Sequence, residues 1–489
     1  MKKNLENLKP SEIWSVFSQI LQVPRPSHHE AQIREFVMDF GKKLSLESFT
    51  DEVGNVIIRK PASPGMENRK GVILQGHLDM VPQKNSDKVH DFEKDPIEAV
   101  IEGDWVRANQ TTLGSDNGIG VSAMLAVLAS TTLKHGPIEA LFTATEETGM
   151  DGANGLQPDV LQGEILINTD SEDEGELYVG CAGGEDITGT FKFKFKKVPF
   201  RSVGIKLNVT GLKGGHSGID IGLGRGNAIQ VFFRILNIVS SQYGARLAEI
   251  EGGSLRNAIP REAFGLLAVK KSQVKKVAAL IDELSDVIKK ELEPNEPDLK
   301  IEAEKVKAPK KVMGKSVQCR LTRAITGCPN GVIRMSYSMA GLVETSSNLA
   351  IVKMNTKEKT ITVACLMRSS VDSAKAHLGT KISSVFSLAG AKVKISGGYP
   401  GWKPNMDSAI LKTMQEVYNS RFGKIPEIKA IHAGLECGIL GGKYPHWDMI
   451  SFGPTIRHPH SPDEKVHIAS VQKFWDFLVE TLASIPEKQ

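Results

Sequence analysis

Short apolar runs alternate with a helical pattern in the first third of the chain. Three runs, Gly71–Gln75, Ile138–Ala144 and Glu164–Thr169, have the length and composition of buried strands. The segment Asn117–Ser130, which lies between the first two, is apolar on nearly all sides and predicts a buried helix. The succession of strand, helix and strand predicts an α/β sheet.

The pattern changes near residue 187. Strand-like alternation at Val203–Gly211 is followed by amphipathic helices at Ala228–Gln242 and Gln273–Glu293, and Leu349–Met367 predicts a hairpin. After a stretch rich in glycine and proline, the first pattern returns and ends in a helix at Ile468–Ile485. We therefore expect an α/β domain with a mixed sheet flanked by helices, formed by residues 1–186 and 399–489. An α+β domain of residues 187–398 would interrupt it.

Charge and composition exclude some classes of function. The chain of 489 residues has 61 basic and 57 acidic residues, a near balance that does not favour nucleic-acid binding. The basic runs Lys192–Lys197 and Lys307–Lys315 are interpreted as a solvated strand face and an exposed loop. No apolar run reaches the ~18 residues of a membrane span. Five scattered cysteines without a C-x-x-C pair indicate a reducing compartment, so a cytoplasmic location is expected.

Acidic and imidazole side chains follow the predicted strands. In open α/β sheets, the edge at the carboxyl ends of the strands is where ligands bind. The side chains at this edge, or in the turn into the buried helix, are His77, Asp79, Asp116, Glu146, Glu147 and Asp170. Two further histidines, His458 and His460, lie in a proline-rich loop near the end of the chain.

This set of side chains indicates a metal centre. Two imidazoles and several carboxylates carry too much negative charge for one zinc ion, and suit two divalent ions about 3.5–4 Å apart that share a bridging carboxylate. Magnesium or calcium would use mainly oxygen ligands, so the histidines favour zinc, with manganese or cobalt as alternatives.

Five motifs, in this order along the chain, carry a resemblance to a known family. They are "GHLDMVP", "GSDNGIG", "TEETG", "NTDSE" and "HSPDE". The chain resembles the M20 family of di-zinc peptidases and deacylases. Within that family, "NTDSEDEGELYVGCAGG", "HAGLECG" and the overall length are most similar to the cytosolic aminoacyl-histidine dipeptidases, also called Xaa-His or beta-alanyl dipeptidases.

The resemblance implies a role for each residue of the centre. Asp116 would bridge the two ions, with His77 and Asp170 completing one site. Glu147 and His460 would complete the other, since His460 matches the family's spacing to a later glutamate better than its neighbour His458 does. Asp79 would orient the first histidine, and Glu146 would be the general base. Related enzymes often have a cis peptide after the bridging aspartate, so Asp116–Asn117 is expected to be cis.

The resemblance also implies substrate-binding groups outside the first pattern. His216 and Asn257 match lid residues that contact the substrate and the tetrahedral intermediate. Arg368 matches an arginine that binds the substrate's terminal carboxylate, and Gly434 lies in a loop that touches the same group. Taken from the residues alone, the glycine-rich segments around the first two are equally consistent with turns. An inserted domain of this kind serves as a lid or a dimerisation domain, so a homodimer is one assembly to consider.

The function expected is hydrolysis of unblocked dipeptides, Xaa-His substrates included, by a water that two zinc ions activate and Glu146 deprotonates. The alternatives on the same scaffold are an N-acyl amino acid deacylase and a carboxypeptidase. An acidic cluster beside Asp170 could meet a substrate ammonium, which favours the dipeptidase. A binding protein without chemistry is disfavoured because the base and every candidate ligand are present. The acidic cluster consists of Glu172, Asp173, Glu174 and Glu176.

Overall fold

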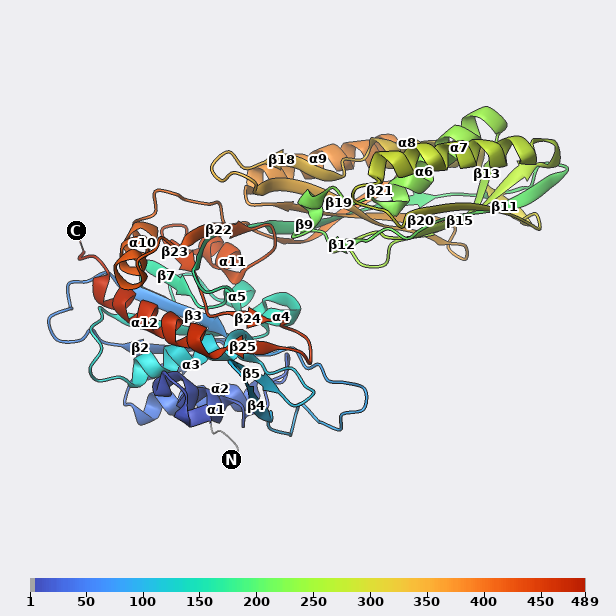
Figure 1. Cartoon of the computed structure of the whole chain (residues 1–489). Helices are drawn as coiled ribbons and strands as arrows, with labels where there is room; N and C mark the ends of the chain where they lie inside the picture. The colour runs from blue at the N-terminus through green and yellow to red at the C-terminus, as the bar shows by residue number, and fades with distance from the viewer. Residues whose placement is uncertain (1–4, 489) are drawn as a thin grey trace. The chain divides into compact units, whose positions relative to one another are not determined.

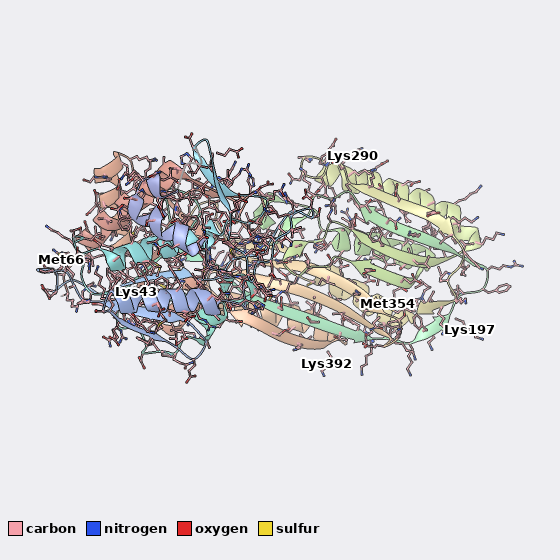
Figure 2. The ribbon with its side chains drawn as sticks, turned by 90° about the horizontal axis from the view of Figure 1, so that it is seen from below. Lys43, Met66, Lys197, Lys290, Met354 and Lys392 are labelled. Carbon is pink, nitrogen blue, oxygen red and sulfur yellow. The ribbon has the colours of Figure 1, made fainter. Side chains whose placement is uncertain are left out.

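The computed structural model describes residues 5–488, and the chain divides into two compact units (Figure 1). The first unit consists of Met1–Gly180, Pro404–Ala430 and Leu435–Gln489, and the second of Cys181–Lys403 and Ile431–Gly434. In Figure 2, Lys43 and Met66 belong to the first unit, and Lys197, Lys290, Met354 and Lys392 to the second.

The first unit is built on a mixed sheet of eight strands, in the order β1-β2-β6-β3-β7-β23-β8-β22. The central strands β6, β3, β7 and β23 are parallel to their neighbours within this group, while β1, β2 and β8 pair antiparallel. The strands are β1 (Glu47–Thr50), β2 (Val56–Lys60), β3 (Val72–His77), β6 (Ile138–Thr143), β7 (Ile165–Asn168), β8 (Glu176–Cys181), β22 (Glu427–Ile431) and β23 (Asp448–Ser451).

Helices flank this sheet, and α3 is the most deeply buried of them. Every residue of α3 from Ser115 to Leu128 is buried, as an all-round apolar pattern predicts. The apolar face of α1, with Trp14 and Phe17, packs on it. The helices of this unit are α1 (Ser11–Ile20), α2 (Ala31–Lys43), α3 (Ser115–Ala129), α4 (Glu146–Gly149), α5 (Asp151–Gly155), α10 (Ala409–Phe422), α11 (Glu436–Lys443) and α12 (Ile468–Ser484).

A small four-stranded sheet, not expected from the sequence, positions the late histidine loop. Its order is β24-β25-β5-β4, from Ile456–Arg457, Lys465–His467, Trp105–Ala108 and Ala99–Glu102. Strand β25 pairs antiparallel with β5, which comes shortly before Asp116 in the chain. The loop between β24 and β25 carries both candidate histidines, so this sheet ties it to the segment that leads into α3.

The second unit is a nine-stranded antiparallel sheet covered by four long helices on one face (Figure 1). The strand order is β16-β11-β15-β13-β19-β20-β9-β21, with β18 paired to β19. The helices are α6 (Ala228–Tyr243), α7 (Val274–Leu292), α8 (Lys315–Gly327) and α9 (Asp372–Leu388). The strands are β9 (Gly183–Lys192), β11 (Ser202–Thr210), β13 (Arg246–Gly252), β15 (Ala263–Lys270), β16 (Lys300–Val306), β18 (Gly331–Met335), β19 (Val343–Asn355), β20 (Thr360–Ser369) and β21 (Lys392–Tyr399).

The core of the second unit lies between the helices and the sheet. Phe232 and Phe386, both fully buried, reach from α6 and α9 into this layer. Two short strand pairs complete the unit. They are β10 (Phe195–Lys197) with β17 (Lys311–Met313), and β12 (Gly215–His216) with β14 (Ala258–Ile259).

The predicted fold class, an α/β unit with a mixed sheet and an interrupting α+β segment, is confirmed. The predicted buried strands correspond to β3, β6 and β7, and the predicted hairpin to β19 and β20, which turn between Asn355 and Thr360. Among the described residues, no helix is long and apolar enough to cross a membrane.

Candidate metal centre

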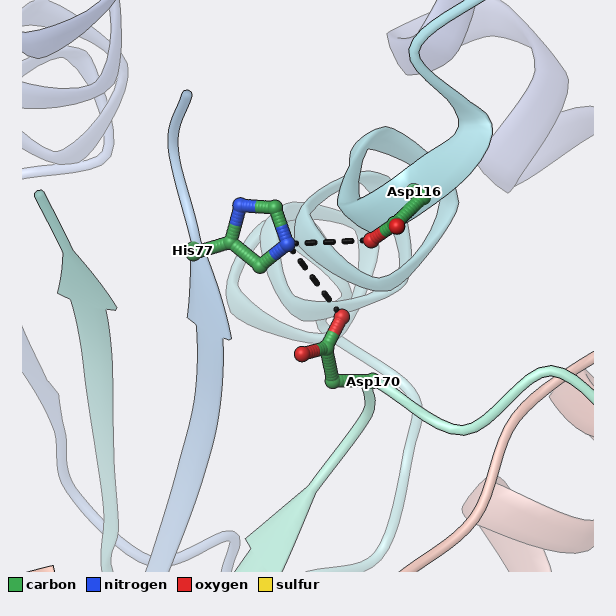
Figure 3. A group of neighbouring side chains, drawn as sticks. All are labelled: His77, Asp116 and Asp170. Carbon is green, nitrogen blue, oxygen red and sulfur yellow. Dashed lines mark hydrogen bonds and ion pairs between the residues drawn. The ribbon is translucent and has the colours of Figure 1, made fainter. Parts of the chain in front are cut away.

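His77 ends β3 and is the centre of a buried cluster (Figure 3). Its Nε2 atom lies 3.0 Å from Oδ1 of Asp116 and 3.3 Å from Oδ1 of Asp170. Asp116 belongs to the first turn of α3, and Asp170 follows β7 by two residues. The parallel pairing of β3 with β7 brings these chain ends to the same edge of the sheet.

Asp79, on the other side of the imidazole, links it to the glutamate pair. Its Oδ1 lies 3.3 Å from Nδ1 of His77, and its carboxylate accepts the backbone N–H groups of Glu146 at 2.9 Å and Glu147 at 3.3 Å. The Ser27 hydroxyl donates to it at 2.8 Å. Burial would raise the pKa of Asp79, but these hydrogen bonds and the His77 charge lower it to about 2. Asp79 therefore stays ionised and holds both the imidazole and the glutamate turn.

Asp116 presents its two oxygens to two different histidines. Oδ1 faces His77, while Oδ2 lies 3.1 Å from Nε2 of His460. The same nitrogen of His460 lies 2.9 Å from Oε2 of Glu147. Although burial opposes ionisation, hydrogen bonds from His460 and His77 keep the pKa of Asp116 well below its usual range. The neighbouring His458 is exposed and lies outside this set of contacts.

The backbone around Asp116 is held from both sides. Glu464 accepts the N–H groups of Leu113 and Ser115 at 2.9 and 2.7 Å, and the Ser115 hydroxyl at 2.6 Å. The buried guanidinium of Arg25 donates to the carbonyl oxygen of Gly114, whose φ of 70° and close contact with that guanidinium leave no room for a side chain. The Asp116–Asn117 peptide is cis, which confirms the sequence-based prediction.

The glutamate pair lies in a helical turn that follows the strand end, rather than at the strand end itself. Strand β6 ends at Thr143, Thr145 has a φ of 54°, and Glu146 begins the short helix α4. Successive residues of a helix point about 100° apart, yet one oxygen of each glutamate lies within 4.8 Å of the other and of a ring nitrogen of His77. Burial, together with the charges of Asp170 and other nearby carboxylates, raises the pKa of Glu146 well above its usual range against the opposing charge of His77.

The cluster fits divalent metal ions on the evidence of its own atoms. Three groups of side chains each bring their ligand atoms within 4.8 Å of one another; two of these groups share Asp116, and the third consists of His77, Glu146 and Glu147. Oε1 of Glu147 is buried and accepts no hydrogen bond among the described residues. Hydrogen bonds that His460 donates to the carboxylates of Asp116 and Glu147 raise its pKa to about 11, so a positive charge is strongly favoured at this point. Carboxylate and imidazole donors around such a position suit a transition-metal ion. The two groups that share Asp116 are His77, Asp116 and Asp170, and Asp116, Glu147 and His460.

The second unit contains a separate cationic cluster around Arg368. This guanidinium is only 5% exposed, and within residues 5–488 no carboxylate forms an ion pair with it. Its Nη1 donates to the Tyr399 hydroxyl at 3.1 Å, and its Nη2 lies 3.5 Å from Nε2 of His216. Nδ1 of His216 accepts the N–H groups of Gly218 and Ile219 at 3.2 and 3.1 Å, so the proton of the neutral ring is on Nε2. Two donors therefore face the same point, an arrangement that an anionic oxygen would satisfy.

The other predicted residues of the second unit lie in short loops. Pairing of β12 with β14 places Asn257 directly before the residue opposite His216, and its backbone oxygen accepts the N–H of Ser217 at 2.8 Å. Gly434 follows Ala433, whose carbonyl accepts the N–H of Ala182 at 3.0 Å.

Sequence reasoning missed a buried histidine in the second unit. Nε2 of His432 lies 2.7 Å from the Ser346 hydroxyl, while its Nδ1 is buried without a hydrogen-bond partner among the described residues. Burial and the positive charge of Arg368 lower the pKa of His432 to about 3, so the ring is neutral. This histidine is the first residue of the "HAGLECG" motif, in which the family resemblance implies a role only for the backbone at Gly434.

Two buried charges of the first unit were also missed or undervalued. Arg25 has no motif around it. Glu464 is the later glutamate whose spacing favours His460 over His458, and no role of its own was predicted. A third buried group, Glu436, accepts the Gln75 amide at 2.6 Å and the Thr143 hydroxyl at 2.7 Å. Glu464 follows a polar, proline-rich loop and Glu436 begins α11, so neither stands at the end of an apolar run, and only distant contacts show what they hold.

Three of the four residues of the acidic cluster are engaged by other side chains. Asp173 pairs with Arg457 at 2.6 Å, Glu174 with Lys473 at 3.1 Å, and Glu176 accepts the Tyr178 hydroxyl at 2.7 Å. Glu172 forms no ion pair within the described part of the chain. Burial and the charges of Asp116 and Asp170 raise its pKa to about 8. Glu172 is therefore the member of the cluster that an incoming cation would stabilise most.

Comparisons with known proteins agree with this geometry. The chain is 47% identical over 484 residues to the cytosol non-specific dipeptidase of Escherichia coli, covering 99% of each chain. It is 48% identical to the solved aminoacylhistidine dipeptidase from Vibrio alginolyticus, with a TM-score of 0.95 and coverage of 100% of this chain and 99% of that one. Aminopeptidase PepT from Bacillus cereus shares the fold at 14% identity, with a TM-score of 0.57 over 98% of this chain and 99% of that one.

The profile described as "Peptidase family M20/M25/M40" matches residues 73–484, a span that contains every candidate ligand. The chain therefore belongs to peptidase family M20/M25/M40.

Proposed function

We propose that this protein is a dinuclear metal-dependent dipeptidase that hydrolyses unblocked dipeptides, Xaa-His dipeptides among them. The observation that carries the proposal is the pair of ligand groups sharing Asp116, in a chain that is 47% identical to a dipeptidase over 99% of its length. The two similar dipeptidases are named differently, one as non-specific and the other as aminoacylhistidine-directed. The name of the first, with the scattered cysteines, supports a cytoplasmic location.

In this proposal, one divalent ion is held by His77, Asp116 and Asp170, and the other by Asp116, Glu147 and His460, with zinc as the expected metal. Ions bound there would lower the pKa of a water and polarise the peptide carbonyl. Nδ1 of His77 faces Asp79, which fixes the orientation of the ring. Nε2 therefore points at Asp116.

Glu146 is the proposed general base. It accepts one proton from the attacking water as the new C–O bond forms, and then donates that proton to the nitrogen of the leaving amine as the peptide C–N bond breaks. Burial makes its carboxylate a stronger base than an exposed glutamate. The backbone N–H of Glu146 is fixed to Asp79, which holds the base beside the metal ligands.

The second unit is proposed to act as a lid domain that supplies the substrate-binding groups. Arg368 would bind the C-terminal carboxylate, with His216 donating to the same anion or to the oxyanion that develops during attack. Asn257 and the backbone at Gly434 would complete this subsite. Glu172 would meet the free ammonium of the substrate, which an N-acylated substrate lacks.

The substrate class is tested by metal analysis together with a substrate panel. Purified protein should contain two equivalents of divalent metal and hydrolyse unblocked dipeptides, beta-alanyl-histidine included, with both metal and activity lost on chelation. N-acyl amino acids should be poor substrates. An active protein with one equivalent of metal, or a preference for N-acyl amino acids, would contradict the proposal.

Asp116→Ala should abolish retention of both ions, because its carboxylate is shared by the two ligand groups. The loss of metal affinity should exceed the ~10–100-fold that is usual when a residue hydrogen-bonded to a metal ligand is substituted. Metal content of the purified variant is the measurement, and Asp39→Ala, a substitution on the exposed face of α2, is the control. Tight retention of one ion would show that Asp116 serves only one site.

The two adjacent glutamates should give different kinetic defects. Glu147→Gln should weaken the binding of one ion. Excess metal should restore part of the activity of this variant. Glu146→Gln should keep both ions and lose ~10²–10⁴-fold in kcat with little change in KM, because the base acts only in the transition state. Activity against metal concentration distinguishes them. Rescue of the Glu146 variant by metal would reverse the two assignments.

Glu172→Gln should lower kcat/KM for unblocked dipeptides by ~10–100-fold, mainly through KM, because a charge-assisted contact with the ammonium contributes about 1.5–3 kcal/mol. Hydrolysis of an N-acetylated dipeptide should be unaffected by this substitution. Asp173→Asn, which removes a carboxylate already paired with Arg457, is the matched control. Equal losses on both substrates would remove Glu172 from ammonium recognition.

A further inference from the structure

Two lysine-rich runs that the proposed peptidase function does not use come together in the second unit. Strand β10 pairs antiparallel with β17, so that Lys197 lies directly opposite Lys311. The second run had been interpreted as an exposed loop, which is wrong for the part that forms β17 and the start of α8. The pairing of these two strands brings the two lysine-rich runs together on one surface, and neither run indicates this contact by itself.

This surface is hollowed into a groove of about 1240 Å³, here named the lysine groove. Eight lysines and a single acidic residue, Glu358, line it. Within residues 5–488, none of the eight amines forms an ion pair with a carboxylate. The lining comes from Lys192–Lys197, Lys310–Lys311, Gly314–Val317 and Glu358–Lys359.

The alternation of phenylalanine and lysine fixes how the amines are presented. Phe193 is buried and packs edge-on against Phe195, with ring centroids 5.0 Å apart. Because side chains alternate along extended chain, Lys194 and Lys196 point to the side opposite these rings, whereas Lys197 and its partner Lys311 lie on the ring side, where the Lys311 amine is 5.7 Å from the centroid of Phe195. The eight lysines thus line the groove from both sides of the β10–β17 pair and from the turns beside it.

Concentrating these charges costs stability in the unliganded protein. Like charges directly opposite each other on paired strands, as in Lys197 and Lys311, are destabilising. Nothing within the unit offsets them with an acidic partner. An anion bound in the groove would remove the repulsion and gain several charge-assisted contacts at once.

The lining favours phosphate over carboxylate. It contains no arginine, the residue whose planar fork suits a carboxylate, whereas lysine binds phosphate as a compact point charge. Helix α8 begins at the edge of the groove, at Lys315, with no side chain capping its first turn, which adds to the positive potential there. The number of amines exceeds what one phosphate group can contact.

We propose that the lysine groove binds an oligophosphate anion, either inorganic tripolyphosphate or the triphosphate chain of a nucleotide. This site lies wholly within the second unit and is independent of the proposed dipeptidase activity.

The test is a calorimetric titration of the full-length protein with sodium tripolyphosphate. A variant combining Lys194→Gln, Lys196→Gln and Lys311→Gln should bind at least 10-fold more weakly than the unmodified protein. The matched control combines Lys289→Gln, Lys290→Gln and Lys300→Gln, exposed lysines of the same unit outside the groove, and should bind as the unmodified protein does. Lys290 lies well apart from Lys197 in Figure 2. Both variants lose three positive charges and keep the metal ligands, so general electrostatics and metal chelation contribute equally.

A thermal shift gives a second readout. The triple groove variant should show a smaller tripolyphosphate-induced rise in melting temperature than the matched control. Tighter binding of a nucleoside triphosphate than of tripolyphosphate would identify the nucleotide as the source of the phosphates. Absence of tripolyphosphate binding, equal weakening in both triple variants, or binding only of a single-stranded oligonucleotide or an acidic peptide would overturn the proposal.

Discussion

The structure of the first unit depends on the concentration of carboxyl groups at one edge of a buried sheet. Asp79, Asp116 and Asp170 lie within a few ångströms of His77, where burial and the charge of Asp116 raise the pKa of Asp170 to about 7, and burying carboxylates without compensation is costly. Their cost is offset by hydrogen bonds to backbone N–H groups, by the two imidazoles, and by whatever cation the cluster holds. The negative potential that destabilises this group of carboxylates would also bind a divalent ion strongly. The cost in folding and the capacity for function therefore have one cause.

Much of the surrounding structure serves to keep that cluster in place. Arg25 donates to the carbonyl groups of Leu78 and Asp79 at 2.8 and 2.9 Å, and so fixes the strand end that carries His77. Glu464, which lies almost 350 residues later in the chain, accepts hydrogen bonds from the backbone N–H groups before Asp116. The second unit shows the opposite polarity, with Arg368 buried and the neutral His216 donating toward the same point.

The sequence predicted those parts of the site that depend on local pattern. Apolar runs located β3, β6 and β7, and the edge rule for parallel strands then grouped His77, Asp116 and Asp170. It could not predict contacts that depend on distant pairing. The position of His460 rests on the small sheet that joins β25 to β5, and the position of Glu146 and Glu147 rests on helix α4, which follows the left-handed Thr145. Arg25 stands in no recognisable motif, and the motif that contains His432 indicates no role for this histidine, so only the folded chain shows what the two side chains contact.

The central claim is that Asp116 holds two ions at once. Crystals of the zinc-loaded protein, with anomalous diffraction recorded on both sides of the zinc absorption edge, test it most directly. The account predicts two anomalous peaks per chain about 3.5–4 Å apart, with one oxygen of Asp116 directed at each. A single peak, or two peaks of which only one contacts Asp116, would contradict it.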